Sequence, residues 1–392
     1  MKYLKDFELK NKKVLVRCDF NVPLDENQKI TDDNRIKQSL PTIKFIIENG
    51  GMPILISHLG APGGKVVPEL SLNPVQERLK QLLQVPVQLA SSCLGNEAIE
   101  LAQKLTPNQV LLLENLRFQP NEKNNDPEFA SHLAKLGDIY INDAFATAHR
   151  AHASIVGIPR YFREKGLGLL FQKEMEYYER SLLTPKRPLC VILGGSKVST
   201  KLSALKNLAD KADKFIIGGA MANTFLAAQG LQMGRSLFEP ELFAKVLELL
   251  GSLARRDCKV YLPVDFMVGP SPSATGLARA VTSLEVPADT MALDIGPATS
   301  LLYKEALQTA ETIIWNGPMG AFENEDYSKG TTGLIENLSS AHGLKVVGGG
   351  DTDAAIHQME LGHKFDYIST GGGAFLALLE GQSLPALDAL HS

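Results

Sequence analysis

Short apolar segments recur along the whole chain, separated by stretches long enough to form a helix. Most of them are rich in Val and Ile and nearly continuous, which is typical of strands buried on both faces of a parallel sheet. Alternation of such strands with helices predicts an α/β fold. The segments are residues 13–18, 53–57, 85–89 (weaker), 109–113 and 138–141 in the first half, and 189–193, 214–217, 259–262, 312–315, 345–347 and 366–369 in the second.

The two halves each contain one such series, which predicts two domains in a chain of 392 residues. A charged amphipathic segment at 171–183, followed by a proline-containing break at 184–188, marks the join. We therefore expect two doubly wound, Rossmann-like parallel-sheet domains, residues 1–170 and 189–375, joined by a helix hinge within 171–188.

Composition narrows the class of protein further. The formal net charge is -4 and the pI is about 6.1. The overall electrostatic field of the protein therefore does not favour binding to nucleic acid or to an anionic membrane. The four cysteines, Cys18, Cys93, Cys190 and Cys258, form no C-x-x-C pair, which argues against structural zinc and a disulfide framework. No apolar run of membrane-spanning length or signal-peptide character occurs, so we expect a cytoplasmic protein without a membrane partner.

Polar side chains follow the predicted strands of the first half. In open α/β sheets ligands bind beyond the carboxyl ends of the strands, and the Arg and His residues there form what we call the basic rim. Its guanidiniums can bind phosphate and carboxylate groups in bidentate fashion. Any one Arg taken alone is better interpreted as a solvated or ion-paired residue, but their repetition at successive strand ends favours binding. The basic rim comprises Arg35, His58, Arg117, His149, Arg150 and His152.

Glycine-rich turns follow the strands of the second half. Glycine lets the backbone approach a ligand, and N–H groups at helix N-termini favour anions, so these turns predict a surface for a polyphosphate. The turns are Gly194-Gly195-Ser196-Lys197, Gly218-Gly219-Ala220, Asn316-Gly317-Pro318, Gly348-Gly349-Gly350-Asp351-Thr352 and Gly371-Gly372-Gly373.

Charged residues accompany these turns. Lys197 and Lys201 are four apart at the start of an expected helix (200–212), so we expect them to share a face and to neutralise phosphates; without the preceding glycines they would be interpreted as surface lysines. Asp351 can hold Mg²⁺ through its carboxylate, can cap a helix, or can do both. Arg17 lies within a strand, and we assign it a structural role.

Several common signatures are absent from the sequence. There is no G-x-x-x-x-G-K-[ST], no G-x-G-x-x-G after the first strand of either half, no G-x-S-x-G and no protein-kinase catalytic loop. A nicotinamide-dependent dehydrogenase, the rival enzyme with twin α/β domains, is therefore disfavoured. A metabolite-binding protein without activity is the non-enzymatic alternative.

Nine motifs spread over essentially the whole chain, in this order, resemble the phosphoglycerate kinase family. One motif would be weak, but the ordered set is specific. The motifs cover residues 14–23, 57–60, 114–117, 142–145, 148–152, 193–198, 315–318, 348–352 and 369–373.

The resemblance implies reversible phosphoryl transfer in glycolysis, from 1,3-bisphosphoglycerate to MgADP, giving 3-phosphoglycerate and MgATP. It implies that the first domain holds 3-phosphoglycerate, that the second holds the Mg-nucleotide with Mg²⁺ on Asp351, that residues 376–392 return to the first domain, and that the protein is a monomer. The implied residues are Asp19, Asn21, Arg35, His58, Leu59, Gly60, Ala61, Arg117 and Arg150 for substrate; Lys201, Glu323, Gly349, Gly350, Asp351 and Thr352 for nucleotide; and Arg35, Lys197, Gly371, Gly372 and Gly373 for catalysis.

The sequence departs from the family pattern at one position of the rim. After Gly60 the family usually places an arginine, whereas this chain has Ala61 followed by Pro62. This departure bears on substrate affinity and is the only support for the non-enzymatic alternative.

Overall fold

The computed structural model describes residues 1–391 and divides the chain into two compact units. The first contains Met1–Glu176 and the segment from Ser383 onward, and the second contains Tyr177–Gln382. The boundaries expected from the sequence are 170/171 and 375/376. Residues 376–382 lie in the second unit because α13 (Gly372–Leu379) continues across the expected boundary and Asn207 Nδ2 donates to the Leu379 carbonyl at 2.8 Å.

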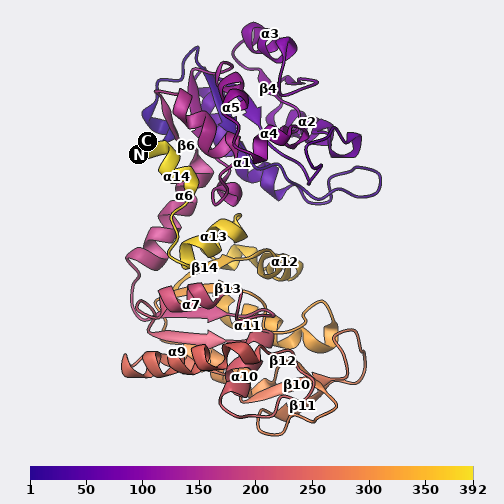
Figure 1. Cartoon of the computed structure of the whole chain (residues 1–392), viewed down its shortest axis with the longest axis vertical. Helices are drawn as coiled ribbons and strands as arrows, with labels where there is room; N and C mark the ends of the chain where they lie inside the picture. Colours follow the sequence, from indigo (N-terminus) through magenta and orange to yellow (C-terminus); the bar gives the residue numbers. More distant parts are fainter. Residues whose placement is uncertain (392) are drawn as a thin grey trace. The chain divides into compact units, whose positions relative to one another are not determined.

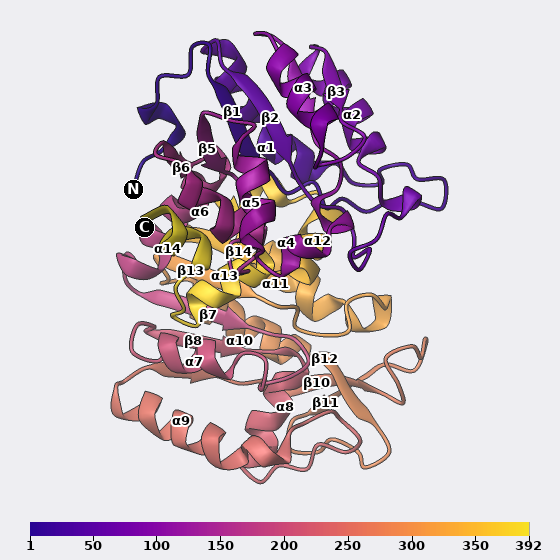
Figure 2. The same cartoon turned by 45° about the horizontal axis from the view of Figure 1, so that its top comes forward.

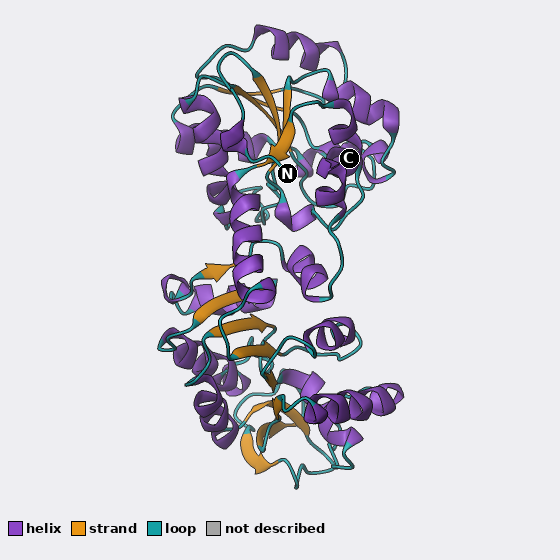
Figure 3. Cartoon of the chain, turned by 90° about the vertical axis from the view of Figure 1, so that its left-hand side faces the viewer, coloured by secondary structure: helices purple, strands orange, loops and turns teal. Residues whose placement is uncertain are grey.

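The first unit is built on a sheet of six parallel strands in the order β3-β4-β2-β1-β5-β6. Helices surround the sheet, as Figure 1 and Figure 3 show. The strands are β1 (Lys13–Arg17), β2 (Met52–Ile56), β3 (Val87–Leu89), β4 (Val110–Leu112), β5 (Ile139–Asn142) and β6 (Lys165–Leu167); the helices are α1 (Asn34–Glu48), α2 (Asn73–Leu83), α3 (Asn96–Lys104), α4 (Pro120–Lys123), α5 (Pro127–Ala134), α6 (Leu169–Tyr178, which runs into the second unit) and α14 (Pro385–His391).

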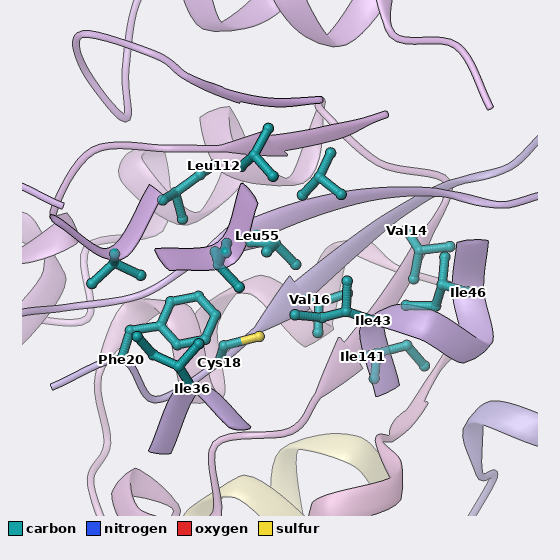
Figure 4. Close-up of a cluster of buried hydrophobic side chains, with 14 of the residues drawn as sticks. Val14, Val16, Cys18, Phe20, Ile36, Ile43, Ile46, Leu55, Leu112 and Ile141 are labelled. Atoms are coloured by element: carbon teal, nitrogen blue, oxygen red, sulfur yellow. The ribbon is translucent and has the colours of Figure 1, made fainter. Parts of the chain in front are cut away.

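The core of the first unit lies between β1 and α1. Ile36, Ile43 and Ile46 fall on one face of α1 and are fully buried, because their spacing follows the helical repeat. They pack with Val14 and Val16 of β1 and their neighbours, as Figure 4 shows. This packing fixes the carboxyl end of β1 relative to the first turn of α1, which carries Arg35.

The second unit contains a second six-stranded parallel sheet, in the order β15-β14-β13-β7-β8-β9. Its core is a separate cluster around Trp315. The strands are β7 (Leu189–Leu193), β8 (Lys214–Ile217), β9 (Lys259–Tyr261), β13 (Thr312–Asn316), β14 (Leu344–Gly348) and β15 (Tyr367–Ile368); the helices are α7 (Leu202–Leu208), α8 (Gly219–Ala228), α9 (Phe243–Arg255), α10 (Pro297–Leu307), α11 (Lys329–Ser339), α12 (Gly350–Gln358) and α13.

The expected α/β class is confirmed: each unit is a parallel-sheet α/β domain, and each predicted strand is present within a few residues. β6 was not predicted from the sequence. Nor was an antiparallel sheet of three strands within the second unit, β10 (Asp265–Gly269), β11 (Arg279–Thr282) and β12 (Met291–Ile295), which Figure 2 shows. β6 has three residues, β10 is only partly buried, and β11 is mostly exposed. β12 is largely buried, but Asp294 interrupts its apolar run. None of these strands therefore shows the continuous apolar run by which the others were found.

Residues 1–391 include no helix long and apolar enough to cross a membrane. The four cysteines are buried and free.

Candidate functional site

The strand ends of the first unit bring the predicted basic residues together. His58, after β2, lies within electrostatic range of the guanidiniums of Arg35, Arg117 and Arg150. The cause is topological: the carboxyl ends of neighbouring parallel strands meet at one edge of the sheet. Four residues of the expected basic rim, Arg35, His58, Arg117 and Arg150, therefore lie near one another in this unit.

Asp19, directly after β1, orders one side of the rim. Its Oδ2 accepts a hydrogen bond from Arg35 Nη1 at 2.6 Å, and its Oδ1 accepts one from the Asn21 backbone N–H at 3.2 Å. Asn21 Oδ1 in turn accepts from the Gly60 N–H at 2.8 Å. These hydrogen bonds fix the loop after β1 against the loop after β2.

The loop at 58–61 is held from the other side by residues after β4. Asn115 Nδ2 donates to the Leu59 carbonyl at 2.7 Å, and Asn115 Oδ1 accepts from the Leu59 N–H at 3.2 Å. Arg117 Nη1 donates to the Gly60 carbonyl at 2.6 Å. Leu59 is therefore buried and engaged within the protein, whereas Ala61 is exposed beside the rim.

Burial and mutual repulsion act on the rim's titratable groups. Burial lowers the pKa of Arg117 to about 10, and the positive charges of Arg150 and Arg17 add to this shift. Burial lowers the pKa of His152 to about 4, with Arg117 and Arg150 adding to it. The pKa of His149 is lowered by burial and by Arg150, whose Nε donates to His149 Nε2 at 3.4 Å. A cluster that disfavours its own positive charges is suited to an anion.

In the second unit the glycine-rich turns after β7, β8 and β13 are joined through their backbones. The Gly195 N–H donates to the Pro318 carbonyl, and the Gly219 N–H donates to the Met319 carbonyl, both at 3.0 Å. Gly219 has a φ of +62°, and a Cβ there would lie 2.6 Å from the backbone N and O of Gly195. Glycine is required because no side chain fits between the turns.

A cavity of about 300 Å³ opens against these turns. Its apolar wall comes partly from β12, a strand that was not predicted from the sequence. Glu323 lines this cavity and a second one of about 610 Å³ beside it, and Asp351, in the first turn of α12, lines the smaller one. The smaller cavity is lined by Gly195, Ser196, Gly219, Ala220, Leu237, Pro272, Met291, Ala292, Leu293, Pro318, Gly320, Ala321, Glu323 and Asp351.

The two lysines are placed differently from what we expected. Helix α7 begins at Leu202, so Lys197 lies in the preceding loop and Lys201 is the residue before the helix. Lys197 is exposed, whereas Lys201 Nζ donates to the carbonyls of Gly194 at 2.6 Å and Asn316 at 2.9 Å. Burial lowers the pKa of Lys201 to about 8, and the charge of Asp351 opposes that shift. The expectation of a shared helical face is wrong.

The remaining predicted nucleotide residues lie at the N-terminus of α12, and the predicted catalytic glycines lie at the N-terminus of α13. Thr352 is buried, and its hydroxyl accepts from the Gly317 N–H at 2.8 Å, which ties the turn after β13 to α12. Gly349 precedes α12 with a φ of +108°, and Gly350 begins that helix. A Cβ on Gly372 would lie 3.4 Å from Gly349 Cα, so the turn at 371–373 approaches the turn at 348–352.

Asp351 supplies a carboxylate suited to Mg²⁺, a cation that is bound through one or two carboxylates with phosphate oxygens and waters completing its shell. No cluster of three or more His, Cys, Asp or Glu residues able to hold a metal occurs within residues 1–391. The residues present therefore fit a Mg²⁺ ion that arrives with nucleotide phosphates, and not a metal held by the protein alone.

Clustered guanidiniums on one α/β unit and a glycine-lined cavity beside a lysine and a carboxylate on the other define a phosphotransferase. The comparisons with known proteins agree. The family model described as phosphoglycerate kinase matches residues 4–382.

Curated relatives match over the full length. The chain is 48% identical over 392 residues to the phosphoglycerate kinase of Desulfotalea psychrophila, covering 100% of both chains. It is 48% identical over 392 residues to that of Geobacter metallireducens, covering 100% of this chain and 98% of the relative.

Solved structures also match over the full length of this chain. The phosphoglycerate kinase of Coxiella burnetii superposes with a TM-score of 0.90 at 40% identity, and that of Pyrococcus horikoshii with 0.82 at 32%, each covering 100% of this chain and 98% of the other. The chain belongs to the phosphoglycerate kinase family and is a phosphotransferase with a carboxyl group as acceptor.

Proposed function

We propose that the chain transfers a phosphoryl group reversibly between 1,3-bisphosphoglycerate and MgADP, giving 3-phosphoglycerate and MgATP, as a cytoplasmic monomer without a nucleic-acid or membrane partner. The observation that carries the substrate assignment is the cluster around His58, where three rim guanidiniums lie within electrostatic range of one imidazole. Such a cluster matches a small ligand that bears both a phosphate and a carboxylate.

In this proposal the rim holds the acid substrate. Arg117, Arg150 and His58 bind its anionic groups, and Arg35 lies at the edge where the acyl phosphate would sit. The acceptor in the reverse direction is a carboxylate, which is ionised near pH 7. No general base is therefore needed, and catalysis depends on alignment and on neutralising charge in transfer.

The second unit holds the nucleotide. The apolar wall of the smaller cavity suits a planar base, Glu323 suits ribose hydroxyls, and the amides at the starts of α12 and α13 suit phosphates. Mg²⁺ on Asp351 would supply charge neutralisation between the phosphates. Lys197, which is exposed in its loop, is free to follow the transferring group together with the amides of Gly371, Gly372 and Gly373.

Transfer requires the two ligands to meet and water to leave. We place the hinge for that motion within residues 171–188, where α6 ends and is followed by a π-helical turn at Glu179–Leu183. Small-angle scattering tests this step: the radius of gyration should fall when both 3-phosphoglycerate and a MgATP analogue are present, and an unchanged radius would refute closure.

The activity itself is tested by coupling 3-phosphoglycerate-dependent ADP formation to a reporter. Turnover of 3-phosphoglycerate in the presence of MgATP is the expected result. No turnover, with both ligands still binding by calorimetry, would identify the chain as a binding protein that has lost the reaction.

A further inference from the structure

Arg17, which the sequence analysis treated as structural, contacts a residue of the rim. The side chain is 1% exposed at the end of β1, and no carboxylate of residues 1–391 lies within ion-pair distance of it. Its guanidinium donates to Ser154 Oγ through Nε at 2.9 Å, to the Cys18 carbonyl through Nη1, and lies with Nη2 3.1 Å from His58 Nδ1.

The hydroxyl of Ser154 links Arg17 to a buried carboxylate. Ser154 Oγ donates to Glu122 Oε1 at 2.5 Å, and the Ser154 N–H donates to Glu122 Oε2 at 2.9 Å. Because the Ser154 proton is committed to the carboxylate, its lone pairs are left to accept from Arg17. Glu122 is itself 1% exposed, so the chain from Glu122 through Ser154 to Arg17 is buried and directed.

This arrangement fixes the proton of His58. A guanidinium has five N–H donors, no acceptor, and does not deprotonate in proteins. Nδ1 of His58 must therefore be the acceptor, which leaves the single imidazole proton on Nε2. Asp19 Oδ1 is 3.8 Å from the same Nδ1, too far to compete as a hydrogen-bond partner.

The charged surroundings of His58 agree with a neutral ring. Burial lowers its pKa well below the ordinary value, and the positive charges of Arg17, Arg117, Arg150 and Arg35 lower it further. Nε2 has no hydrogen-bond partner within residues 1–391 and is not one of the enclosed polar atoms that lack a partner. Nε2 is therefore not fully enclosed, although the His58 side chain is only 3% exposed.

We propose that Arg17 is a positioning residue, which holds His58 in the tautomer protonated on Nε2 so that this N–H donates to an anionic oxygen of the substrate. The inference rests on the proposed function, in which the rim binds the acid substrate. It adds a buried chain of hydrogen bonds that runs from Glu122 to His58. This chain determines which ring nitrogen of His58 carries the proton and can donate in that site.

Nitrogen NMR of the full chain tests the tautomer without any assay of activity. Loss of the His58 signals in His58→Gln assigns them. In the wild type we expect Nδ1 to be of the unprotonated, pyridine type and Nε2 of the protonated, pyrrole type. Arg17→Lys keeps a donor without an acceptor and should preserve this pattern, whereas Arg17→Met removes the donor and should let a fraction protonated on Nδ1 appear. A protonated Nδ1 in the wild type would overturn the inference.

Substitution of His58 tests the use of the donor and leaves Arg17 intact. The Gln side-chain amide can place its NH₂ where Nε2 lies, whereas the Asn amide reaches only the Nδ1 position. We expect His58→Asn to raise KM for 3-phosphoglycerate roughly tenfold more than His58→Gln, the effect of losing one charge-assisted hydrogen bond. The two variants should have the same kcat.

The two measurements separate the two proposals. If Asn and Gln raise KM equally, or Asn raises it less, the positioning inference fails while the rim keeps its place in the proposed function. If neither substitution changes KM, His58 does not contact the substrate, and both the inference and that residue's part in the proposed function fall.

Discussion

Arg35 Nη1 lies 2.6 Å from Asp19 Oδ2, yet the two side chains differ in exposure, 39% for Arg35 and 6% for Asp19. The buried carboxylate holds the guanidinium at the carboxyl edge of the sheet, and the guanidinium keeps most of its other donors toward solvent. A contact of this kind orients a charged group for a ligand and contributes little to folding, since partly exposed ion pairs stabilise by about 0 to 1 kcal/mol.

Replacing Arg35 by Ala should therefore separate catalysis from stability. We expect kcat to fall on the order of a hundredfold, equivalent to about 3 kcal/mol of lost charge stabilisation, while the free energy of unfolding changes by about 1 kcal/mol or less. Lys44→Ala removes a positive charge from an exposed position on the same helix and is the control. Near-normal kcat in Arg35→Ala would remove this residue from the transfer step.

Glu323 offers a test of the nucleotide site. Glu323→Ala should raise KM for MgADP roughly tenfold, the effect of losing a hydrogen bond to a charged group, and leave KM for 3-phosphoglycerate unchanged. Steady-state kinetics with each substrate varied in turn measures both. Glu325→Ala, on the exposed carboxylate that lines only the larger cavity, should change neither value; if both variants behave alike, ribose recognition does not reside in Glu323.

A substitution at Ala61 is expected to strengthen the binding of 3-phosphoglycerate. The residue is exposed, and it directly follows Gly60, whose carbonyl holds Arg117. Ala61→Arg should add a guanidinium to the rim and lower KM for 3-phosphoglycerate, by up to roughly tenfold. Val66→Arg adds the same charge at a position of the same loop that is 72% exposed. Equal effects of the two substitutions would indicate general attraction of the anion and no specific contact.

Gly219 tests the close approach of the turns after β7 and β8. Gly219→Ala combines a positive φ with a contact of 2.6 Å to the Gly195 backbone, whereas Gly230→Ala has a positive φ of +93° and open space around its Cβ. We expect Gly230→Ala to lower the free energy of unfolding by about 1–2 kcal/mol from backbone strain, and Gly219→Ala to lower it further and weaken nucleotide binding. Urea unfolding and nucleotide titration measure the two effects, and equal losses of stability would argue against the steric explanation.

Asp294 makes stability depend on pH. Burial raises the pKa of this carboxyl to about 8, against opposing hydrogen bonds from the N–H groups of Gly330 and Ile295. A carboxyl whose pKa is higher in the folded state contributes its stability below the unfolded-state value near 4, and this is lost as pH rises toward 8.

Urea unfolding between pH 4 and 8 checks this prediction. Asp294→Asn should lower stability at acidic pH, because an amide NH₂ cannot accept from both N–H groups, and should reduce the decline with rising pH. The difference between the two proteins is therefore expected to shrink toward pH 8. Parallel pH profiles for the wild type and the variant would show that this carboxyl does not titrate in that range.

Much of the candidate site could be predicted because it follows from the fold class. Once 13–18 and 53–57 are recognised as parallel strands, Asp19 and His58 must lie at the same sheet edge, and the glycine-rich turns of the second half must gather in the same way. The side-chain contacts could not be predicted. Lys201 was expected on a helical face, but its ammonium turns inward because the carbonyls of Gly194 and Asn316 converge there.

The sequence by itself determined the two α/β domains and the residues placed at their strand ends, since apolar runs and the helical patterns between them can be read without knowledge of packing. Only the tertiary structure decided which of those residues support one another. Arg17 lies within a strand and Glu122 is 32 residues from Ser154, so no spacing rule joins them to His58. These residues come into contact only through long-range packing, which buries the charge of Arg17 and leaves it few hydrogen-bond partners.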